Sequence, residues 1–296
     1  MTVALATAVR TLPSGPGLAY EPKFDGHRLV VLRTVEGVAL QARSGRIVTR
    51  AFPDLAAAAL QLPAGTVLDG EVVVWHAGRT EFALVQRRAA AASAARAAVL
   101  AQTLPASYAA FDVLELAGLD LRARPYERRR ALLVDLLLPL GPPLQPVPMT
   151  TDPELAATWY ETLPDSGIEG LVVKRLDQAY PAGKRGWRKL RHTNVRDAAV
   201  VGYTGTARRP LALVLVLPVG DETPLVSSPL TAALRVEVAS VVAARAPAAA
   251  AEGATVTAIG LGEVPFRPLD PPLTAEVRHA STRHPPPEVL RLRTDL

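Results

Sequence analysis

Lysine is the scarcest basic residue in this chain, and its positions stand out for that reason. Of the 33 basic residues, 29 are arginine, and the lysines are Lys23, Lys174, Lys184 and Lys189. Arginine stays protonated, whereas a lysine amine can lose its proton and attack phosphorus. The composition elsewhere uses arginine wherever a positive charge is sufficient. The four lysines are therefore candidates for positions where a nucleophile or a compact point charge is needed.

Lys23 lies in the sequence EPKFDGHR, which spans residues 21–28 and directly precedes an apolar run. An attack by lysine on an α-phosphate needs a lowered pKa or a nearby metal ion, and cationic groups for the charge that grows on phosphorus. The acid, glycine and arginine around Lys23 predict a nucleotide-binding loop. Taken alone, the same string also fits an ordinary surface turn.

Charged groups also mark later segments. Residues 67–75 form an apolar run that contains the acidic pair Asp69 and Glu71, which core packing alone would not choose. Residues 184–191 contain five basic side chains, and no acid occurs from residue 178 to residue 196. This segment predicts a local electropositive strip. Part of it could equally be a solvated face, and Asp69 could simply cap a turn.

These segments, in this order and spacing, resemble the motifs of the covalent nucleotidyltransferases, and specifically of short bacterial ATP-dependent DNA ligases. The resemblance extends from about residue 18 to residue 295. It implies that Lys23 attacks ATP and carries AMP. It also implies that Glu21 lies near the adenine amino group, and Arg28 near the ribose or the nick phosphate.

The resemblance assigns further cofactor-binding residues. Arg43 would contact phosphate, and Phe111, which by its sequence alone could be a core residue, would stack on adenine through its π face. Lys174 and Lys189 would act on the α-phosphate during catalysis. Arg185 belongs to the last motif of the catalytic domain and to the basic strip.

The resemblance also implies metal-binding residues and a motif at the end of the chain. Glu71 and Glu169 would bind Mg²⁺ or Mn²⁺, directly or through water. The final residues RLRTDL resemble an Arg-x-Asp motif in which Arg293 and Asp295 orient the leaving pyrophosphate. Two positions depart from the family pattern, because Arg191 stands where a second lysine is common and no lysine follows Asp295.

The periodicity of the chain predicts an α+β fold in two domains. The resemblance implies that residues 1–192 form an adenylation domain of the nucleotidyltransferase type, with antiparallel sheets and helices. The short β-like runs of residues 193–296 fit an OB-type β-barrel. The expected strands span residues 29–32, 37–40, 67–75, 108–116, 170–174, 198–203, 211–217 and 255–261. The expected helices span residues 81–101, 126–138, 153–163 and 230–245.

Composition narrows the class of protein. The chain has 296 residues, 49% of them hydrophobic, and a net charge of +5 that is compatible with a polyanionic partner. It has no cysteine, and its five histidines lack ligand-like spacing, so thiolate and histidine metal sites are not expected. No long apolar run or signal sequence is present. We therefore expect no membrane partner. The resemblance implies a monomer in the bacterial cytoplasm, associated with the nucleoid.

The resemblance implies an enzyme that seals nicked duplex DNA, in repair rather than replication. Two alternatives stay open. An RNA ligase or a GTP-using capping enzyme shares the Lys-x-Asp-Gly logic, although the Glu-Pro-Lys context and the Arg-x-Asp end favour a DNA ligase. A catalytically inactive nucleic-acid-binding module would need only positive charge, which does not explain the retained lysines.

Overall fold

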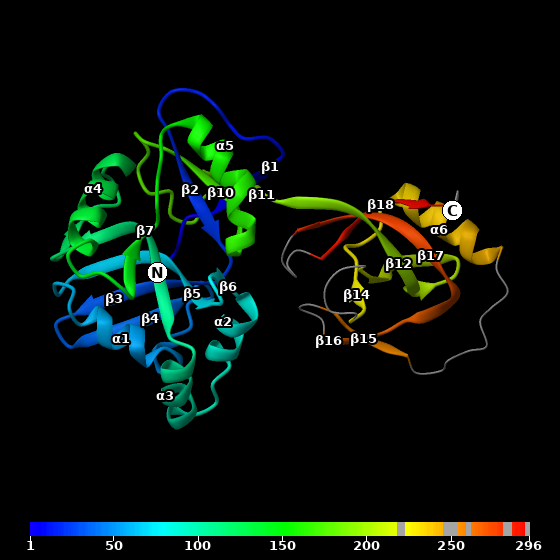
Figure 1. Cartoon of the computed structure of the whole chain (residues 1–296), viewed down its shortest axis with the longest axis horizontal. Coiled ribbons are helices and arrows are strands. Elements are labelled where there is room, and N and C mark those ends of the chain that lie inside the picture. Colours follow the sequence, from blue (N-terminus) through cyan, green and yellow to red (C-terminus); the bar gives the residue numbers. More distant parts are fainter. Residues whose placement is uncertain (218–222, 245–253, 259–261, 281–285, 294–296) are drawn as a thin grey trace. The chain divides into compact units, whose positions relative to one another are not determined.

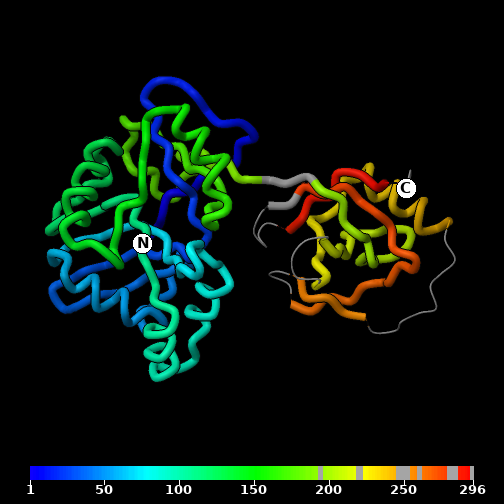
Figure 2. Tube along the Cα trace, in the orientation of Figure 1, coloured from blue at the N-terminus to red at the C-terminus, as the bar shows by residue number. Residues whose placement is uncertain are grey.

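The computed structural model describes residues 1–217, 223–244, 254–258, 262–280 and 286–293. The chain divides into two compact units, Met1–His192 and Thr193–Leu296. Figure 1 labels the elements of each unit, and Figure 2 traces the chain through them. Strands and helices are mixed in the first unit without a regular alternation, which confirms the expected α+β class.

The first unit contains a four-stranded sheet. Its strand order is β1-β11-β10-β2, with β1 parallel to β11 and the other neighbours antiparallel. Alternation along the strands separates two faces. Leu18, Tyr20, Leu171 and Val173 are buried on one face, next to helix α5 (Figure 1). The strands are β1 (Ala6–Val9), β2 (Leu18–Phe24), β10 (Ile168–Arg175) and β11 (Trp187–Arg191), and α5 is Pro153–Thr162.

A seven-stranded sheet forms the rest of this unit. Its main order is β4-β3-β5-β7-β8, and β6 and β9 pair with β5 and β7. Its strands are β3 (His27–Thr34), β4 (Gly37–Ala42), β5 (Thr66–His76), β6 (Arg79–Thr80), β7 (Ala106–Leu116), β8 (Leu119–Asp120) and β9 (Leu144–Pro146). The helices of the unit, besides α5, are α1 (Pro53–Ala59), α2 (Phe82–Ala89), α3 (Ala94–Thr103), α4 (Tyr126–Leu137) and the 3₁₀ turns η1 (Thr49–Ala51) and η2 (Leu163–Ser166).

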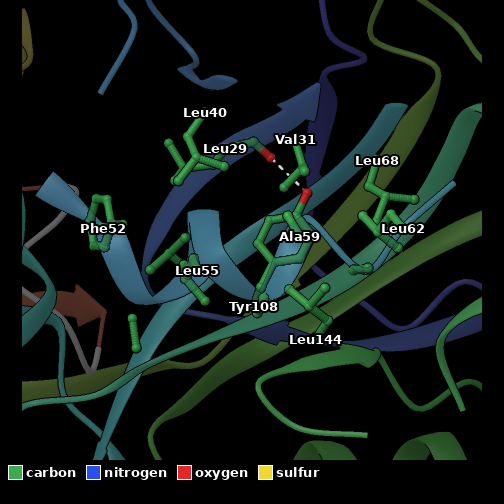
Figure 3. Close-up of a cluster of buried hydrophobic side chains, with 14 of the residues drawn as sticks. Leu29, Val31, Leu40, Phe52, Leu55, Ala59, Leu62, Leu68, Tyr108 and Leu144 are labelled. Atoms are coloured by element: carbon green, nitrogen blue, oxygen red, sulfur yellow. Dashed lines mark hydrogen bonds between the residues drawn. The ribbon is translucent and has the colours of Figure 1, made fainter. Parts of the chain in front are cut away.

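Apolar side chains from β3, β4, β5 and β7 form the main core with helix α1. Figure 3 shows Leu29, Leu40, Leu55 and Tyr108 converging there. The Tyr108 hydroxyl donates a 2.9 Å hydrogen bond to the Leu29 carbonyl, so this buried polar group is satisfied. Val30 points to the opposite face of the sheet, where it joins side chains of the four-stranded sheet in a second cluster. The two sheets therefore meet through these inner faces.

The helix expected over residues 81–101 is wrong in its extent. The structure has two helices there, and α2 ends at Ala89. Ser93 begins α3, and its hydroxyl accepts a hydrogen bond from the Arg96 amide. A side-chain cap of this kind satisfies an amide that an uninterrupted helix would bond to a carbonyl. The alanine-rich composition concealed this boundary.

The second unit contains a five-stranded sheet in the order β14-β13-β12-β17-β18 and a two-stranded ribbon, β15-β16. Helix α6 (Ala232–Ala243) packs on the sheet, with Leu234 and Val238 in the common core. The strands are β12 (Thr193–Thr206), β13 (Arg209–Val216), β14 (Leu225–Val226), β15 (Thr255–Ala258), β16 (Gly262–Pro265), β17 (Arg267–Ala280) and β18 (Glu288–Arg293). In the described parts of both units, no helix has the length and apolarity that crossing a bilayer requires.

Candidate active site

Lys23 lies near the end of strand β2, and only Asp25 and Gly26 separate this strand from β3. The predicted loop beside Lys23 is therefore a short turn between two strands. A Cβ atom at Gly26 would lie 2.0 Å from the carbonyl oxygen of Val72 in β5. Glycine is needed because the turn packs directly against backbone.

A β-bulge in strand β10 directs Glu169 toward this lysine. The pairing of β10 with β2 shifts register between Ile168 and Leu171, so β10 has one residue more than its partner there. Gly170 allows the shift, since its φ is +145° and a Cβ would lie 2.0 Å from the Leu190 carbonyl oxygen. Bulges commonly redirect a side chain next to an active site.

Lys23 and Glu169 form a close ion pair between their side chains. The Lys23 side chain is 20% exposed, whereas the Glu169 side chain is only 2% exposed. The Arg191 guanidinium lies 3.4 Å from the same oxygen of Glu169. The second oxygen, Oε2, is buried and has no hydrogen-bond partner in the described residues. Glu169 thus keeps an acceptor available for a ligand.

Two further carboxyl groups interact electrostatically with this pair. Burial raises the pKa of Asp25 to about 6, and the negative charge of Glu169 raises it as well. Burial raises the pKa of Glu71 to about 7, although Lys23 and Arg28 act to lower it. Asp25 and Glu71 therefore lie in surroundings that disfavour their charged forms, and additional positive charge would offset this effect.

This carboxylate set fits a hard divalent cation, which takes oxygen ligands. In the residues that the structure describes, no group of three or more acidic or histidine side chains forms a complete metal cage. Mg²⁺ does not need one, because it usually binds one or two carboxylates together with waters and substrate phosphates. Glu169 could bind such an ion through its free Oε2. Glu71 could be a second ligand, since the charge of a divalent ion would offset the burial that raises the pKa of this group.

Lys174 lies in a different environment from Lys23. Its ammonium is 2.7 Å from Oε2 of Glu21 and donates a 2.8 Å hydrogen bond to the Phe111 carbonyl. The Tyr126 hydroxyl donates a short hydrogen bond to the other oxygen of Glu21. Since the Lys174 side chain is only 1% exposed, the structure does not bring it to the accessible side of the site, where we expected an α-phosphate contact.

The Phe111 ring is half-buried at the inner face of β7. It meets the buried Trp187 ring edge to face, with 5.7 Å between centroids. The Arg28 guanidinium lies 5.2 Å from the Phe111 ring centre. Phe111 is therefore fixed by contacts from both sheets. Trp187 is a packing residue in this arrangement.

Arg28 is held by Asp69 through two hydrogen bonds, of 2.9 and 2.5 Å. A third donor of Arg28 lies 2.6 Å from the Ala4 carbonyl oxygen. The Tyr180 hydroxyl also donates to Asp69. Asp69 thus orients a half-buried arginine, and the alternative of a simple turn cap is wrong. The Arg28 side chain keeps a 15% exposed fraction beside the site.

Lys189 lies on β11, in register with Val172 of β10, which in turn pairs with Glu21 of β2. Cross-strand partners share a face, so Lys189 lies on the inner face with Glu21. Burial lowers the pKa of Lys189, and Arg191 and Lys23 lower it further. Arg43, which is exposed in the turn after β4, adds to this effect.

Three predicted site residues remain, Arg185 in the first unit and Arg293 and Asp295 in the second part of the chain. Arg185 is exposed in the segment before β11. Arg293, in the second unit, lies 3.2 Å from Asp197 and 2.9 Å from Glu276. Asp295 lies outside the described residues.

A family model described as an ATP dependent DNA ligase domain matches residues 2–191. These residues include the whole group around Lys23. The chain belongs to the ATP-dependent DNA ligase family.

Among its relatives in this ligase family, DNA ligase C2 of Mycolicibacterium smegmatis is 40% identical over 200 residues, and DNA ligase C of Mycobacterium tuberculosis is 36% identical over 204 residues. Each alignment covers 67% of this chain and 56% of the relative, so the chain spans a little over half the length of these proteins. A solved structure of a mycobacterial DNA ligase D complexed with ATP and MES is 26% identical, with a TM-score of 0.58, and covers 100% of this chain and 95% of that one.

Sequence reasoning about this ligase-family chain missed two groups at the site. Asp25 was not assigned a role, although it is next but one to Lys23. The sequence predicts Tyr126 only as the first residue of a helix. In the structure its hydroxyl donates a hydrogen bond to Glu21, which lies 105 positions earlier. Asp25 could have been found from its acidic character beside Lys23. No local signal identifies Tyr126.

Proposed function

We propose that this chain is an ATP-dependent DNA ligase that seals nicks in duplex DNA through an AMP group carried on Lys23. The observation that carries the proposal is the pairing of Lys23, partly exposed, with a buried glutamate that has a free acceptor. A lysine held in this way, within the residues that match the ligase family, is suited to attack a phosphate rather than to serve as surface charge.

In the first step the Lys23 amine, after losing a proton, attacks the α-phosphorus of ATP. A P–N bond forms, the bond to the β-phosphate oxygen breaks, and pyrophosphate leaves. Lys189 and Arg43 supply positive charge for the phosphate oxygens during this transfer. Glu21 accepts a hydrogen bond from the adenine amino group, and Phe111 packs on the adenine ring. Arg28 lies toward the ribose.

Glu71 and Glu169 would hold Mg²⁺ or Mn²⁺. A divalent ion bound there neutralises phosphate charge and orients the transferring group. The residues of the chain contribute the rest. Glu169 keeps the Lys23 side chain directed into the site through its first oxygen, while its second oxygen remains available. Burial on the inner sheet face limits the access of water to the reacting groups.

The second and third steps act on DNA. The 5′-phosphate at a nick attacks the phosphorus of Lys23-AMP, which frees the lysine, and the 3′-hydroxyl then displaces AMP to close the strand. Phosphate contacts without base readout suit an enzyme that must accept any sequence. Arg188 and Arg185, both exposed, together with Arg196 of β12, are suited to such contacts.

We assign residues 1–192 as the adenylation domain and residues 193–296 as an OB-type domain that acts in the first step through Arg293 and Asp295. The five-stranded sheet with a short ribbon and one helix supports the assignment of the second unit. We further propose a monomer that acts in DNA repair at the nucleoid.

A sealing assay tests the proposal. The chain is incubated with a duplex that carries one 5′-labelled nick, and with ATP and Mg²⁺. We expect a longer labelled strand with a DNA nick and ATP, much less with GTP, and much less when both strands are RNA. Sealing of RNA in preference to DNA would favour an RNA ligase. Binding to the nick without sealing and without AMP transfer would favour the inactive binding module.

A further inference from the structure

The Lys174 side chain is almost completely buried, and its polar contacts are to other groups of the protein. Its ammonium bonds to Glu21 at 2.7 Å and to the Phe111 carbonyl at 2.8 Å. It also lies over three aromatic rings, at 4.4 Å from the centre of Trp187, 4.7 Å from Tyr126 and 5.0 Å from Phe111. A buried ammonium persists when it is paired and when ring faces stabilise its charge.

Glu21 is held at both of its carboxylate oxygens. Lys174 lies at Oε2, and the Tyr126 hydroxyl donates to Oε1. The plane of the carboxylate is thereby fixed, and each oxygen keeps a further lone pair. With a donor already at each oxygen, the carboxylate faces a ligand as a hydrogen-bond acceptor and not as a donor.

From these contacts we infer that Lys174 and Tyr126 are positioning residues that hold Glu21 as an obligate hydrogen-bond acceptor, and so make the site select a 6-amino purine over a 6-oxo purine. The inference deepens the proposed function and rests on it. A 6-amino group donates to an ionised carboxylate. A 6-oxo group only accepts, so it would face the carboxylate with two acceptors opposed.

The same lysine also ties the two sides of the purine site together. Its hydrogen bond to the Phe111 carbonyl fixes the strand segment that carries the Phe111 ring, while its ion pair fixes Glu21. Lys174 therefore supports the group that reads the purine edge and the group that packs on the purine face. This role differs from an α-phosphate contact, which requires an accessible ammonium.

Two triphosphates besides ATP distinguish these roles. Purine riboside 5′-triphosphate is ATP without the 6-amino group, and GTP carries a 6-oxo group. The assay is the transfer of labelled nucleotide to the full chain, without DNA, with kcat and KM measured for each triphosphate. We expect the unmodified chain to prefer ATP over purine riboside triphosphate about tenfold or more in kcat/KM, as for other hydrogen bonds to a charged group.

Lys174→Met removes the charge and keeps the length of the side chain. We expect it to bring the preference for ATP over purine riboside triphosphate to within about threefold, mainly through a higher KM for ATP. Tyr126→Phe, which removes one hydrogen bond and no charge, should lower the preference by a smaller factor. A purely structural role would leave the preference unchanged among folded molecules, and an α-phosphate role would lower kcat equally for both triphosphates. Either result overturns the inference.

A double-mutant cycle keeps the test decisive if Lys174→Met folds poorly. Glu21→Gln removes the carboxylate charge, and the double variant Glu21→Gln with Lys174→Met leaves no unpaired buried charge. If Lys174 sets the preference through Glu21, the second change should alter the preference by no more than about threefold in the Glu21→Gln background, while loss of the contact with the Phe111 carbonyl raises the KM for both triphosphates alike. A further drop in kcat in that background would overturn the inference.

Failure of the proposed function gives a different result. In that case the unmodified chain would acquire no label from any triphosphate, and no preference could be measured. A different outcome is that Lys174→Met is labelled by ATP as strongly as the unmodified chain, with the same preference and the same KM. That outcome contradicts the role of Lys174 and leaves the ligase proposal intact.

Discussion

Lys23 and Glu169 form an ion pair across the irregular part of the pairing between β2 and β10. The extra residue in β10 and the left-handed backbone of Gly170 are what bring this glutamate opposite the lysine. One carboxylate thereby faces the proposed nucleophile with its first oxygen and keeps its second oxygen free.

Replacing Glu169 tests whether this carboxylate acts in the site, as an exposed surface acid does not. We expect Glu169→Gln to slow adenylylation by at least about a hundredfold, because the carboxylate that directs Lys23 and would hold the divalent ion is lost. The rate is measured with labelled ATP over a range of Mg²⁺ and Mn²⁺ concentrations. Glu161→Gln, on the exposed face of α5, is the matched control and should be normal. Equal rates for the two variants would remove Glu169 from the site.

Phe111 should contribute to ATP binding more than to chemistry. We expect Phe111→Leu, which keeps apolar volume but loses the aromatic face, to raise the KM for ATP about 5- to 160-fold, since stacking on a base contributes about 1–3 kcal/mol. Phe111→Tyr keeps the ring and should change KM little. An unchanged KM in Phe111→Leu would return this residue to a packing role with Trp187.

Lys189 and Arg188 are neighbours on β11 with opposite surroundings, so they serve as controls for each other. Lys189 is half-buried on the inner face and Arg188 is exposed. Lys189→Ala should slow adenylylation without DNA by about 100- to 1000-fold. Arg188→Ala should leave that step intact, weaken nick binding, and reduce the slope of log affinity against log salt by about one.

The two measurements for this pair are ATP-only adenylylation and the sealing of a nick that is already adenylylated, each at two salt concentrations. Arg185→Ala and Arg196→Ala should behave as Arg188→Ala does. Normal adenylylation in Lys189→Ala, together with slow adenylylation in Arg188→Ala, would mean that the phosphate site lies on the other face of β11.

Asp112 and Arg129 form a fully buried pair with two hydrogen bonds, of 2.7 and 2.9 Å. Arg129→Met should lower the free energy of unfolding by about 3–5 kcal/mol, because it leaves a buried carboxylate without its partner. Adding Asp112→Asn should recover part of the loss. Urea unfolding measures both. The control is Arg122→Met, which breaks the exposed pair with Asp120 and should have little effect. Equal losses of unfolding free energy in Arg129→Met and Arg122→Met would contradict the stabilising role of the buried Asp112–Arg129 pair.

The candidate site could be predicted from the sequence where its residues lie next to strong strand patterns. Glu71, Phe111 and Glu169 each occur within or directly before an apolar run, so their placement in or beside strands followed from local periodicity. Their convergence could be expected only from the resemblance to a family, since no local pattern sets which inner faces meet.

Other features depend on contacts between distant residues and were not predicted. Strand β17 contains Pro268, Pro271 and Pro272, and proline argues against a strand. The register between β12 and β17 shifts near these residues, which accommodates them. The burial of Lys174 likewise depends on Glu21, 153 positions away. A motif could place this lysine on a strand but could not reveal which partner takes its charge.

The central claim is that Lys23 is the residue that becomes adenylylated. Lys23→Arg tests it most directly, because the positive charge and most of the side-chain length survive while the nucleophile is lost. The full chain and the variant are incubated with α-labelled ATP and Mg²⁺, and the protein is separated under denaturing conditions. Thermal unfolding and nicked-DNA affinity, which should be close to those of the unmodified chain, serve as controls. We predict a labelled band from the unmodified chain and none from Lys23→Arg. A labelled band of equal intensity from Lys23→Arg would contradict the account.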